Sequence, residues 1–557
     1  MILSIELRIL EKALKSQKKN NANRILTALA FICLMYIDKV VGTESQYIWL
    51  ITNNFVGVVF AILVIHAFSF KSFLKPFYIS WSILGVFGII GGIAFWYTHQ
   101  VGHLFAYWAT VPLNIWILCL VVFKYIERLF IRKDIKIVIS KWEYAFIVCM
   151  LLMLLSASNS AWPLYYLLIF ELFWHAPFSE KGRAEAFEGM LEGLIFGFVL
   201  LTIYAFLYTP YTQARYRGAY WNSNRNACMY MLAYVAILTK LYMAKKNNGS
   251  RKAWLGILSI VSVGLTVYTG CRTAILGLIF ITLFYGIEIE HRLLNIKWSK
   301  LFINGFCFLA SIIIAIPLLY FPMRYIQEAK GKLGAVVKTI LAGTEETYRL
   351  YGESYVSFDE AVGSALFRIT SSDVESSSEK MEELPRETET QNIESGDVRD
   401  YYTIRYSYAN YPERGNYSFM VPKRFYTGVV SLNHRINIFL VLLHNLNLTG
   451  HMDDEMSIDI ISDVPGAETF RLNNAQNFIL HYLYSYGILV GALFLIMIIV
   501  EEAALIRSAR KQQTEGIAFI MFSFVYLIMG LMEVVWIPGQ LVLILLFVAP
   551  FFILSKN

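Results

Sequence analysis

Residues 253–288 read AWLGILSIVSVGLTVYTGCRTAILGLIFITLFYGIE, two apolar runs that are separated by a short turn at Cys271 and Arg272. Each run approaches the length at which an α-helix crosses a hydrocarbon core of about 30 Å. An arginine at membrane depth costs roughly 2.5–3.5 kcal/mol and cannot lose its charge by deprotonation. Arg272 therefore predicts an anionic partner or a water-filled cavity beside this turn.

The same apolar character extends along the whole chain of 557 residues. Hydrophobic residues make up 57% of it and charged residues only 16%, and the mean hydropathy is +0.52. These values lie outside the range of soluble globular proteins and predict an integral membrane protein. The first apolar run follows a basic, polar stretch and leads into further spans, so we expect it to act as its own signal without cleavage.

Apolar runs of sufficient length predict an all-α polytopic membrane protein with about 14 transmembrane helices, within a range of 12–14. The candidate spans cover residues 25–41, 48–68, 77–97, 105–123, 142–157, 161–175, 188–210, 227–243, 253–269, 273–288, 301–320, 474–500, 515–531 and 536–554. The chain divides accordingly into N-terminal transmembrane helices (1–187), a transmembrane core with arginine motifs (188–320), a long extracytoplasmic loop (321–473) and C-terminal transmembrane helices (474–557).

Lysine and arginine residues gather at the N-terminus and in every second loop, as the positive-inside rule describes. The basic loops lie near residues 71–75, 128–136, 181–183, 245–252, 292–300 and 507–511. With an even number of spans, this pattern predicts that both termini are cytoplasmic and that residues 321–473 lie outside. It also accounts for the net charge of +7, so we expect no nucleic-acid partner.

Several arginines lie on the predicted outer side, against this topological bias. They are Arg215, Arg217, Arg225, Arg272, Arg324 and Arg435. The planar guanidinium group suits bidentate contact with phosphate, so their convergence predicts a receptor for a lipid-linked phosphate or diphosphate. For Arg215, Arg217 and Arg225, anchoring to lipid headgroups is an equal alternative.

Polar residues beside these arginines are further candidates for the site. Asn222 and Asn224 precede a span, so each either caps the helix start or presents its amide group outward. Glu533 precedes the last span and is expected to pair with an outer arginine or to act as a base.

The long outer segment has a polar middle and two different flanks. Residues 371–399 are too acidic and polar to bury a core, and we expect disorder there. Residues 401–417 alternate tyrosines with polar residues, which favours strands, a carbohydrate-facing aromatic surface or a solvated hairpin. Arg435 and the apolar residues 438–443 predict an amphipathic helix at the outer membrane interface. The six cysteines all avoid this segment, which predicts neither a disulfide scaffold nor a zinc site.

Six short motifs follow one another over about residues 188–540, and their order carries more weight than any one of them. They are RYRGAYWNSN (215–224), TGCRTA (269–274), NHRINIF (433–439), LNLTGH (446–451), NAQN (474–477) and YGILVG (486–491). In this order the chain resembles the O-antigen ligase and polysaccharide polymerase superfamily. The resemblance implies a metal-independent, inverting glycosyltransferase of the GT-C type that needs no cofactor.

The resemblance also implies roles for individual residues. Arg272 and either Arg215 or Arg217 would bind the diphosphate of the donor. Asn222 and Asn224 match an Asn-Pro-Asn-like segment of the family, with a serine in place of the usual proline.

On the acceptor side, Arg435 matches the arginine that begins a helix within the long loop, and His451 matches the residue that closes a Gly-His element. Gln476 and Asn477 stand where ligases of the family carry His-Asn, and that histidine is considered the catalytic base. Glutamine accepts no proton at neutral pH, so it would only orient a hydroxyl group. The candidates to replace the base are His451, Asp453, Asp454 and Glu455, with His481 as a weaker one.

The resemblance and the arginines together predict an enzyme of the bacterial plasma membrane with an extracytoplasmic site. Its substrates would be undecaprenyl-diphosphate-linked oligosaccharides, both donor and acceptor, and its further partners a chain-length regulator and a flippase. The missing ligase histidine favours a polymerase over a ligase. A multi-span transporter or flippase for lipid-linked glycans is the alternative from another class.

Overall fold

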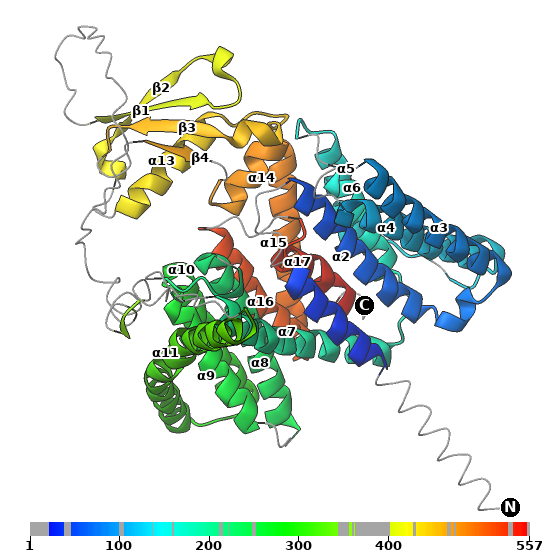
Figure 1. The fold of residues 1–557 in the computed structure, drawn as a ribbon, viewed down its shortest axis with the longest axis horizontal. Helices are drawn as coiled ribbons and strands as arrows, with labels where there is room; N and C mark the ends of the chain where they lie inside the picture. The colour runs from blue at the N-terminus through cyan, green and yellow to red at the C-terminus, as the bar shows by residue number, and fades with distance from the viewer. Residues whose placement is uncertain are drawn as a thin grey trace, which may run out of the picture.

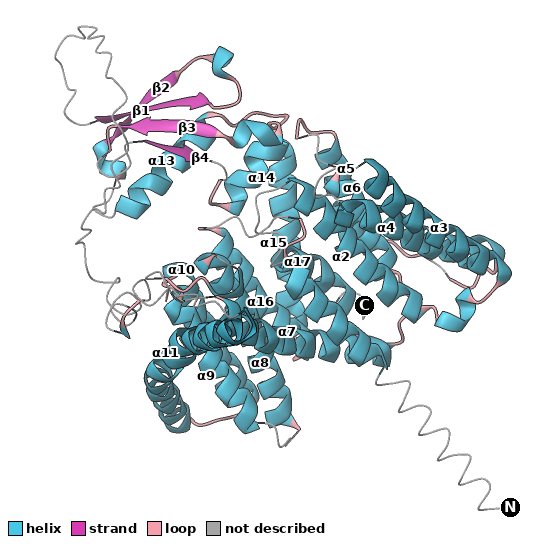
Figure 2. Cartoon of the chain, viewed as in Figure 1, coloured by secondary structure: helices cyan, strands magenta, loops and turns pink. Residues whose placement is uncertain are grey.

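The computed structural model describes the larger part of the chain. The described residues are 22–37, 46–99, 105–135, 137–158, 161–209, 211, 215–220, 222–247, 252–342, 356–358, 361, 401–426, 430–464, 469–472, 475–532 and 538–553. Most of them are helical, and a small sheet lies beyond one end of the helices (Figure 1 and Figure 2).

Seven helices within this part are long and apolar enough to cross a membrane. They are α3 (Pro76–His99), α4 (Phe105–Ile126), α7 (Glu180–Tyr208), α8 (Ser223–Lys246), α10 (Arg272–Phe284), the first part of α11 (Trp298–Ala342) and α15 (Ile488–Arg510). Short π-helical turns at Glu127–Ile131 and Tyr285–Leu293 lengthen α4 and α10. The protein is therefore a helical membrane protein.

The remaining helices are shorter or lie in the sheet region. They are a first helix at Ala22–Ile37, α2 (Gln46–Ala67), α5 (Lys141–Leu154), α6 (Trp162–Trp174), α9 (Lys252–Tyr268), α14 (Phe478–Tyr486), α16 (Thr514–Gly530) and α17 (Leu541–Ile553). Each predicted span coincides with a helix in this set or the previous one. Because seven helices in the described ranges meet the criteria of length and apolarity, the count of 14 spans stays a prediction.

Two helices differ from the ranges expected from the sequence. The range 474–500 contains α14 and α15, which are separated by Gly487 with a φ of +87°. A Cβ at Gly487 would collide with the carbonyl oxygen of Leu448, so the break needs glycine both for its backbone angle and for this close approach. Helix α11 continues to Ala342, past the residue at which the long loop was expected to begin.

The sheet is an addition to the all-α expectation. Its antiparallel strands lie in the order β2 (Tyr417–Pro422), β1 (Tyr401–Tyr408), β3 (Ile458–Ser462) and β4 (Thr469–Leu472). Alternate residues of β1, beginning with Ile404 and Tyr406, are buried on one face. The prediction that residues 401–417 contain strands is confirmed.

Helix α13 (Val430–His444) covers the buried face of the sheet (Figure 1). Its residues Ile438, Val441 and Leu442 are fully buried in the same core as the strands. Its apolar face therefore packs on the sheet, whereas the sequence predicted that this face lies at the membrane interface. We call the strands, α13 and the segments that join them the sheet module.

Two candidates from the sequence lie outside the described residues. They are the acidic stretch 371–399 and Glu533.

Candidate functional site

Arg215 reaches from the loop before α8 to the turn between α9 and α10. Its Nε donates a hydrogen bond to the carbonyl oxygen of Thr269 at 2.9 Å, and its Nη2 donates to the side-chain oxygen of Asn224. Gly270 lies beneath it with a φ of +59°, and a Cβ there would lie 3.3 Å from Cγ of Arg215. Both acceptors are uncharged, so these contacts fix the position of the guanidinium group without cancelling its charge.

Asn222 and Asn226 fasten the same loop to the start of α8. The side-chain oxygen of Asn222 accepts from the N–H of Asn224 at 2.9 Å, which makes Asn222 the N-cap of the helix. The amide nitrogen of Asn226 donates to the carbonyl oxygens of Arg217 and of Asn222. The expected capping role of Asn222 is confirmed, and Asn224 holds Arg215 instead.

Arg272 is the first residue of α10 and is exposed. It follows the turn that holds Arg215 by two residues, so the side chain of Arg215 lies on the turn that leads into α10. Arg217 is exposed in the loop before α8, and the guanidinium of Arg225 lies 5.8 Å from the ring of Tyr220. We call Arg215, Arg217, Arg225 and Arg272 the arginine cluster, and the end of the bundle that carries it the arginine end.

The opposite helix ends carry a different arrangement of charges. Arg24 binds Glu192 through Nε at 2.6 Å and Glu188 at 3.2 Å. Glu127 binds Lys124 and Arg132, each at 2.8 Å. Further contacts of this kind join Lys240 to Glu188 and Glu192, Lys75 to Glu127, and Lys245 to Glu290. We call this the ion-pair end.

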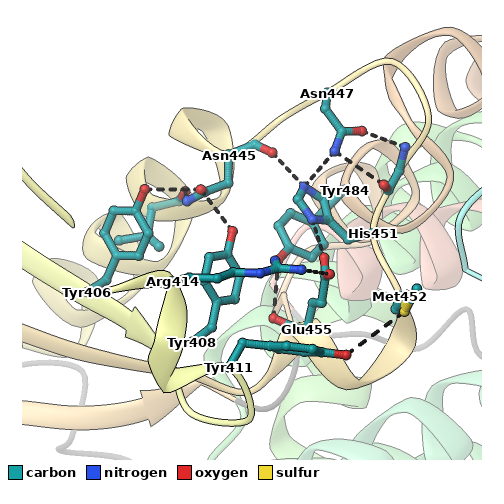
Figure 3. Close-up of polar contacts among 12 residues, drawn as sticks. Tyr406, Tyr408, Tyr411, Arg414, Asn445, Asn447, His451, Met452, Glu455 and Tyr484 are labelled. Carbon is teal, nitrogen blue, oxygen red and sulfur yellow. Dashed lines mark hydrogen bonds and ion pairs between the residues drawn. The ribbon is translucent and has the colours of Figure 1, made fainter. Parts of the chain in front are cut away.

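His451 lies in the sheet module, at the centre of a hydrogen-bonded network (Figure 3). Its Nδ1 lies 2.6 Å from a carboxylate oxygen of Glu455, and its Nε2 lies 2.7 Å from the carbonyl oxygen of Asn445. The ring stacks on Tyr484 with centroids 4.1 Å apart. Both ring nitrogens therefore face oxygen acceptors within the protein, and this arrangement favours a structural role over that of a base for a substrate hydroxyl group.

Glu455 joins this network to the sheet. Arg414, between β1 and β2, donates to its second carboxylate oxygen at 2.7 Å, and this hydrogen bond raises the pKa of Arg414. The hydroxyl of Tyr408 donates to the side chain of Asn445 at 3.0 Å, and burial raises the pKa of Tyr408 to about 12. The pairing of Arg414 with Glu455 could not be predicted from the sequence, because the two residues lie on different loops.

The LNLTGH motif forms a loop that packs on the break between α14 and α15. The N–H of His451 donates to the carbonyl oxygen of Tyr484 at 3.1 Å, and the N–H of Ile488 donates to Asn447 at 2.9 Å. Gly450 has a φ of +83° and lies against the backbone of Ser485. This motif and the YGILVG motif thus satisfy each other's backbone groups at a helix end.

Gln476 and Asn477 immediately precede α14. Gln476 has a φ of +47° and is partly buried. The side chain of Asn477 accepts from the N–H of Leu480 at 3.0 Å and donates to the carbonyl oxygen of Leu531 at 2.9 Å. Asn477 therefore caps α14 and ties it to the end of α16, and these contacts occupy both ends of its amide group.

The other acceptor-side candidates are dispersed. Arg435 lies on α13, next to His434, whose ring packs on Phe470 with centroids 3.8 Å apart; burial lowers the pKa of His434. His481 is partly buried in α14, and its buried Nδ1 has no hydrogen-bond partner among the described residues. The side chains of Asp453 and Asp454 lie outside the described part of the chain.

Within the described ranges, no group of three or more histidine, cysteine, aspartate or glutamate residues has the arrangement of a metal site. All six cysteines are free thiols.

Comparisons with protein-family models and with curated proteins find no match to this chain.

Proposed function

We propose that the protein is a membrane glycosyltransferase that joins undecaprenyl-diphosphate-linked glycans into a longer polysaccharide. The observation that carries the proposal is the placement of Arg215 on the Thr269–Gly270 turn, directly beside the start of α10 at Arg272. An arginine pair that is fixed in this way suits the two phosphates of a lipid-linked donor. The class of substrate, lipid-diphosphate-linked glycans, comes from the order of the six sequence motifs and the family that this order resembles.

The catalytic role of the arginines follows from the position at which negative charge develops on the leaving diphosphate. As the anomeric carbon of the donor sugar separates from the diphosphate, negative charge grows on the leaving oxygen. Guanidinium groups that already point at this position stabilise the transition state without reorganising. The hydroxyl of the acceptor glycan would then attack the anomeric carbon from the opposite face, with inversion.

In this proposal, the attack of the acceptor hydroxyl group depends less on a general base than on stabilisation of the leaving diphosphate. Gln476 cannot accept a proton, Asn477 is used in a helix cap, and His451 is paired with Glu455 and Asn445. We therefore assign most of the catalytic effect to stabilisation of the leaving diphosphate, and the acceptor proton passes to water as the new bond forms.

The proposal includes a topology. The arginine end would face the outside of a bacterial plasma membrane, in a GT-C-type arrangement of about 14 spans with both termini in the cytoplasm. The sheet module lies beyond that end of the bundle (Figure 1), where it would meet the glycan chains. A flippase would supply the donor, and a chain-length regulator would limit the product.

The experiment is a reconstitution. The purified protein is placed in phospholipid vesicles with a defined undecaprenyl-diphosphate oligosaccharide, with and without a metal chelator, and the lipid-linked products are separated by size. We expect longer lipid-linked glycans in both conditions. Movement of the oligosaccharide across the bilayer without a new glycosidic bond would favour a transporter, and transfer only to a second type of acceptor would favour a ligase.

A further inference from the structure

Glu501 lies near the middle of α15, one of the helices that is long and apolar enough to cross a membrane. Its residue surface is 3% exposed. It belongs to a buried face of the helix that also contains Phe494, Met497, Ile498 and Leu505, at the spacing of one helix side. The side chain therefore points into the packed interior of the bundle.

Neither carboxylate oxygen of Glu501 has a hydrogen-bond partner among the described residues. The neighbouring Glu502 differs, because its Oε1 accepts from the hydroxyl of Tyr526 on α16 at 2.8 Å. The carboxylates of the ion-pair end differ as well, since Glu127 and Glu192 each contact basic side chains. Glu501 thus combines full burial, an apolar setting and two unpartnered oxygens.

An ionised carboxylate in such a place has no cation and no hydrogen-bond donor among the described residues to stabilise it. The carboxylic acid carries no net charge and loses much less on transfer from water. An ionisable group at membrane depth is also rarely kept without a function.

We propose that Glu501 is a proton-binding site within the membrane-spanning part of the protein, occupied as the neutral carboxylic acid. The proposal is independent of the glycosyltransferase reaction. A proton that is bound at this depth couples the protonation of one residue to the packing of α15 against its neighbours α5, α14, α16 and α17. It also makes Glu501 a selective target for an apolar carbodiimide.

The reaction of that reagent requires the acid form. The acid proton passes to one nitrogen of the carbodiimide while the carboxyl oxygen bonds to its central carbon, which gives an O-acylisourea. Migration of the acyl group to nitrogen then yields a stable N-acylurea, and the peptide gains the full mass of the reagent with no leaving group. Carboxylates that are held in ion pairs do not have this proton.

The test uses the full-length protein in phospholipid vesicles with N,N′-dicyclohexylcarbodiimide as the probe, followed by peptide mass spectrometry. We expect the label on Glu501 in the folded protein, and a loss of that label in Glu501→Gln. Glu501→Gln should also keep its Tm within about 2 °C, because a neutral amide replaces a neutral acid of nearly the same shape.

Glu192→Gln is the matched control. It makes the same change of a carboxylate to an amide at a partly buried glutamate that is paired with Arg24 and Lys240, so it should lower the Tm by several degrees and leave the label on Glu501. The proposal is overturned if Glu501 takes no label in the wild-type protein. It is overturned equally if Glu501→Gln lowers the Tm as much as Glu192→Gln or prevents folding, since either result would show a charged, paired carboxylate.

Discussion

At the ion-pair end of the bundle, basic side chains contact carboxylates, whereas at the arginine end Arg215 is held by a backbone carbonyl and an amide oxygen. Lys124 illustrates the first arrangement: it is fully buried, lies 2.8 Å from Glu127 and donates to the carbonyl oxygen of Ser72 at 3.0 Å. The contacts of Arg215 with Thr269 and Asn224 fix its place but contribute no opposite charge.

The difference indicates what each end is for. A cation that is paired with a carboxylate within the protein contributes to stability and topology. Its electrostatic attraction for an anionic ligand is weak. A cation that is positioned by neutral groups, as Arg215 is by Thr269 and Asn224, gains no counter-charge from those contacts. The comparison therefore predicts that substitutions at the ion-pair end change stability, and that substitutions at the arginine end change activity.

The largest effect is expected for Glu127→Gln. This carboxylate binds three basic residues and the hydroxyl of Tyr78, so its removal leaves the buried Lys124 without a counter-charge. We expect a loss of about 3–5 kcal/mol in the free energy of unfolding, measured by denaturation in mixed micelles. The specific activity of the protein that remains folded should be unchanged; a loss of activity at normal stability would contradict the comparison.

Arg272→Ala should lower the rate of polymerisation by about 10²–10³-fold while the protein stays inserted and folded. Arg272→Lys should lower the rate of polymerisation nearly as much, because an ammonium group does not reproduce the planar fork of donors. Product length and rate in reconstituted vesicles measure both.

Arg292→Ala is the control for Arg272, because it removes an arginine from the other end of the same helical segment. Arg292 is 74% exposed and pairs with Glu288 at 3.0 Å. Its replacement by alanine should therefore change the free energy of unfolding by less than about 0.5 kcal/mol. Full activity in Arg272→Ala would mean that the arginine cluster has no role in the reaction.

The smallest effect is expected for Asn224→Ala. It removes one neutral group that orients Arg215 but leaves the hydrogen bond to Thr269, so we expect about a tenfold loss in kcat/KM. Asn222→Ser serves as the control, since serine retains the N-cap of α8. An equal loss in both variants would show that the helix start matters as a whole rather than the orientation of Arg215.

Apolar runs placed most of the helices, because each helix of a membrane protein satisfies its own backbone, but they did not show the break between α14 and α15. The cap at Asn222 was also foreseeable from local sequence, since the capping oxygen and the N–H groups that it accepts lie within one turn. The sheet was only partly foreseeable: the alternation in residues 401–417 predicted strands, but β3 and β4 lie far along the chain.

Residue roles were harder to predict than the elements that carry them. His451 was a candidate base, and its partners Glu455 and Asn445 now favour a structural role. Glu501 was not foreseen, because the predicted span ended at residue 500 and nothing in one helix shows which of its faces is buried.

The sequence by itself determined that this is a helical membrane protein and that Arg272 lies where a short turn joins two apolar helices, since hydropathy and charge are local properties. Only the tertiary structure decided that Arg215 packs on that same turn and that Glu501 lies in the interior without a partner. Those facts depend on which distant segments meet, and that is set by the packing of whole helices against one another.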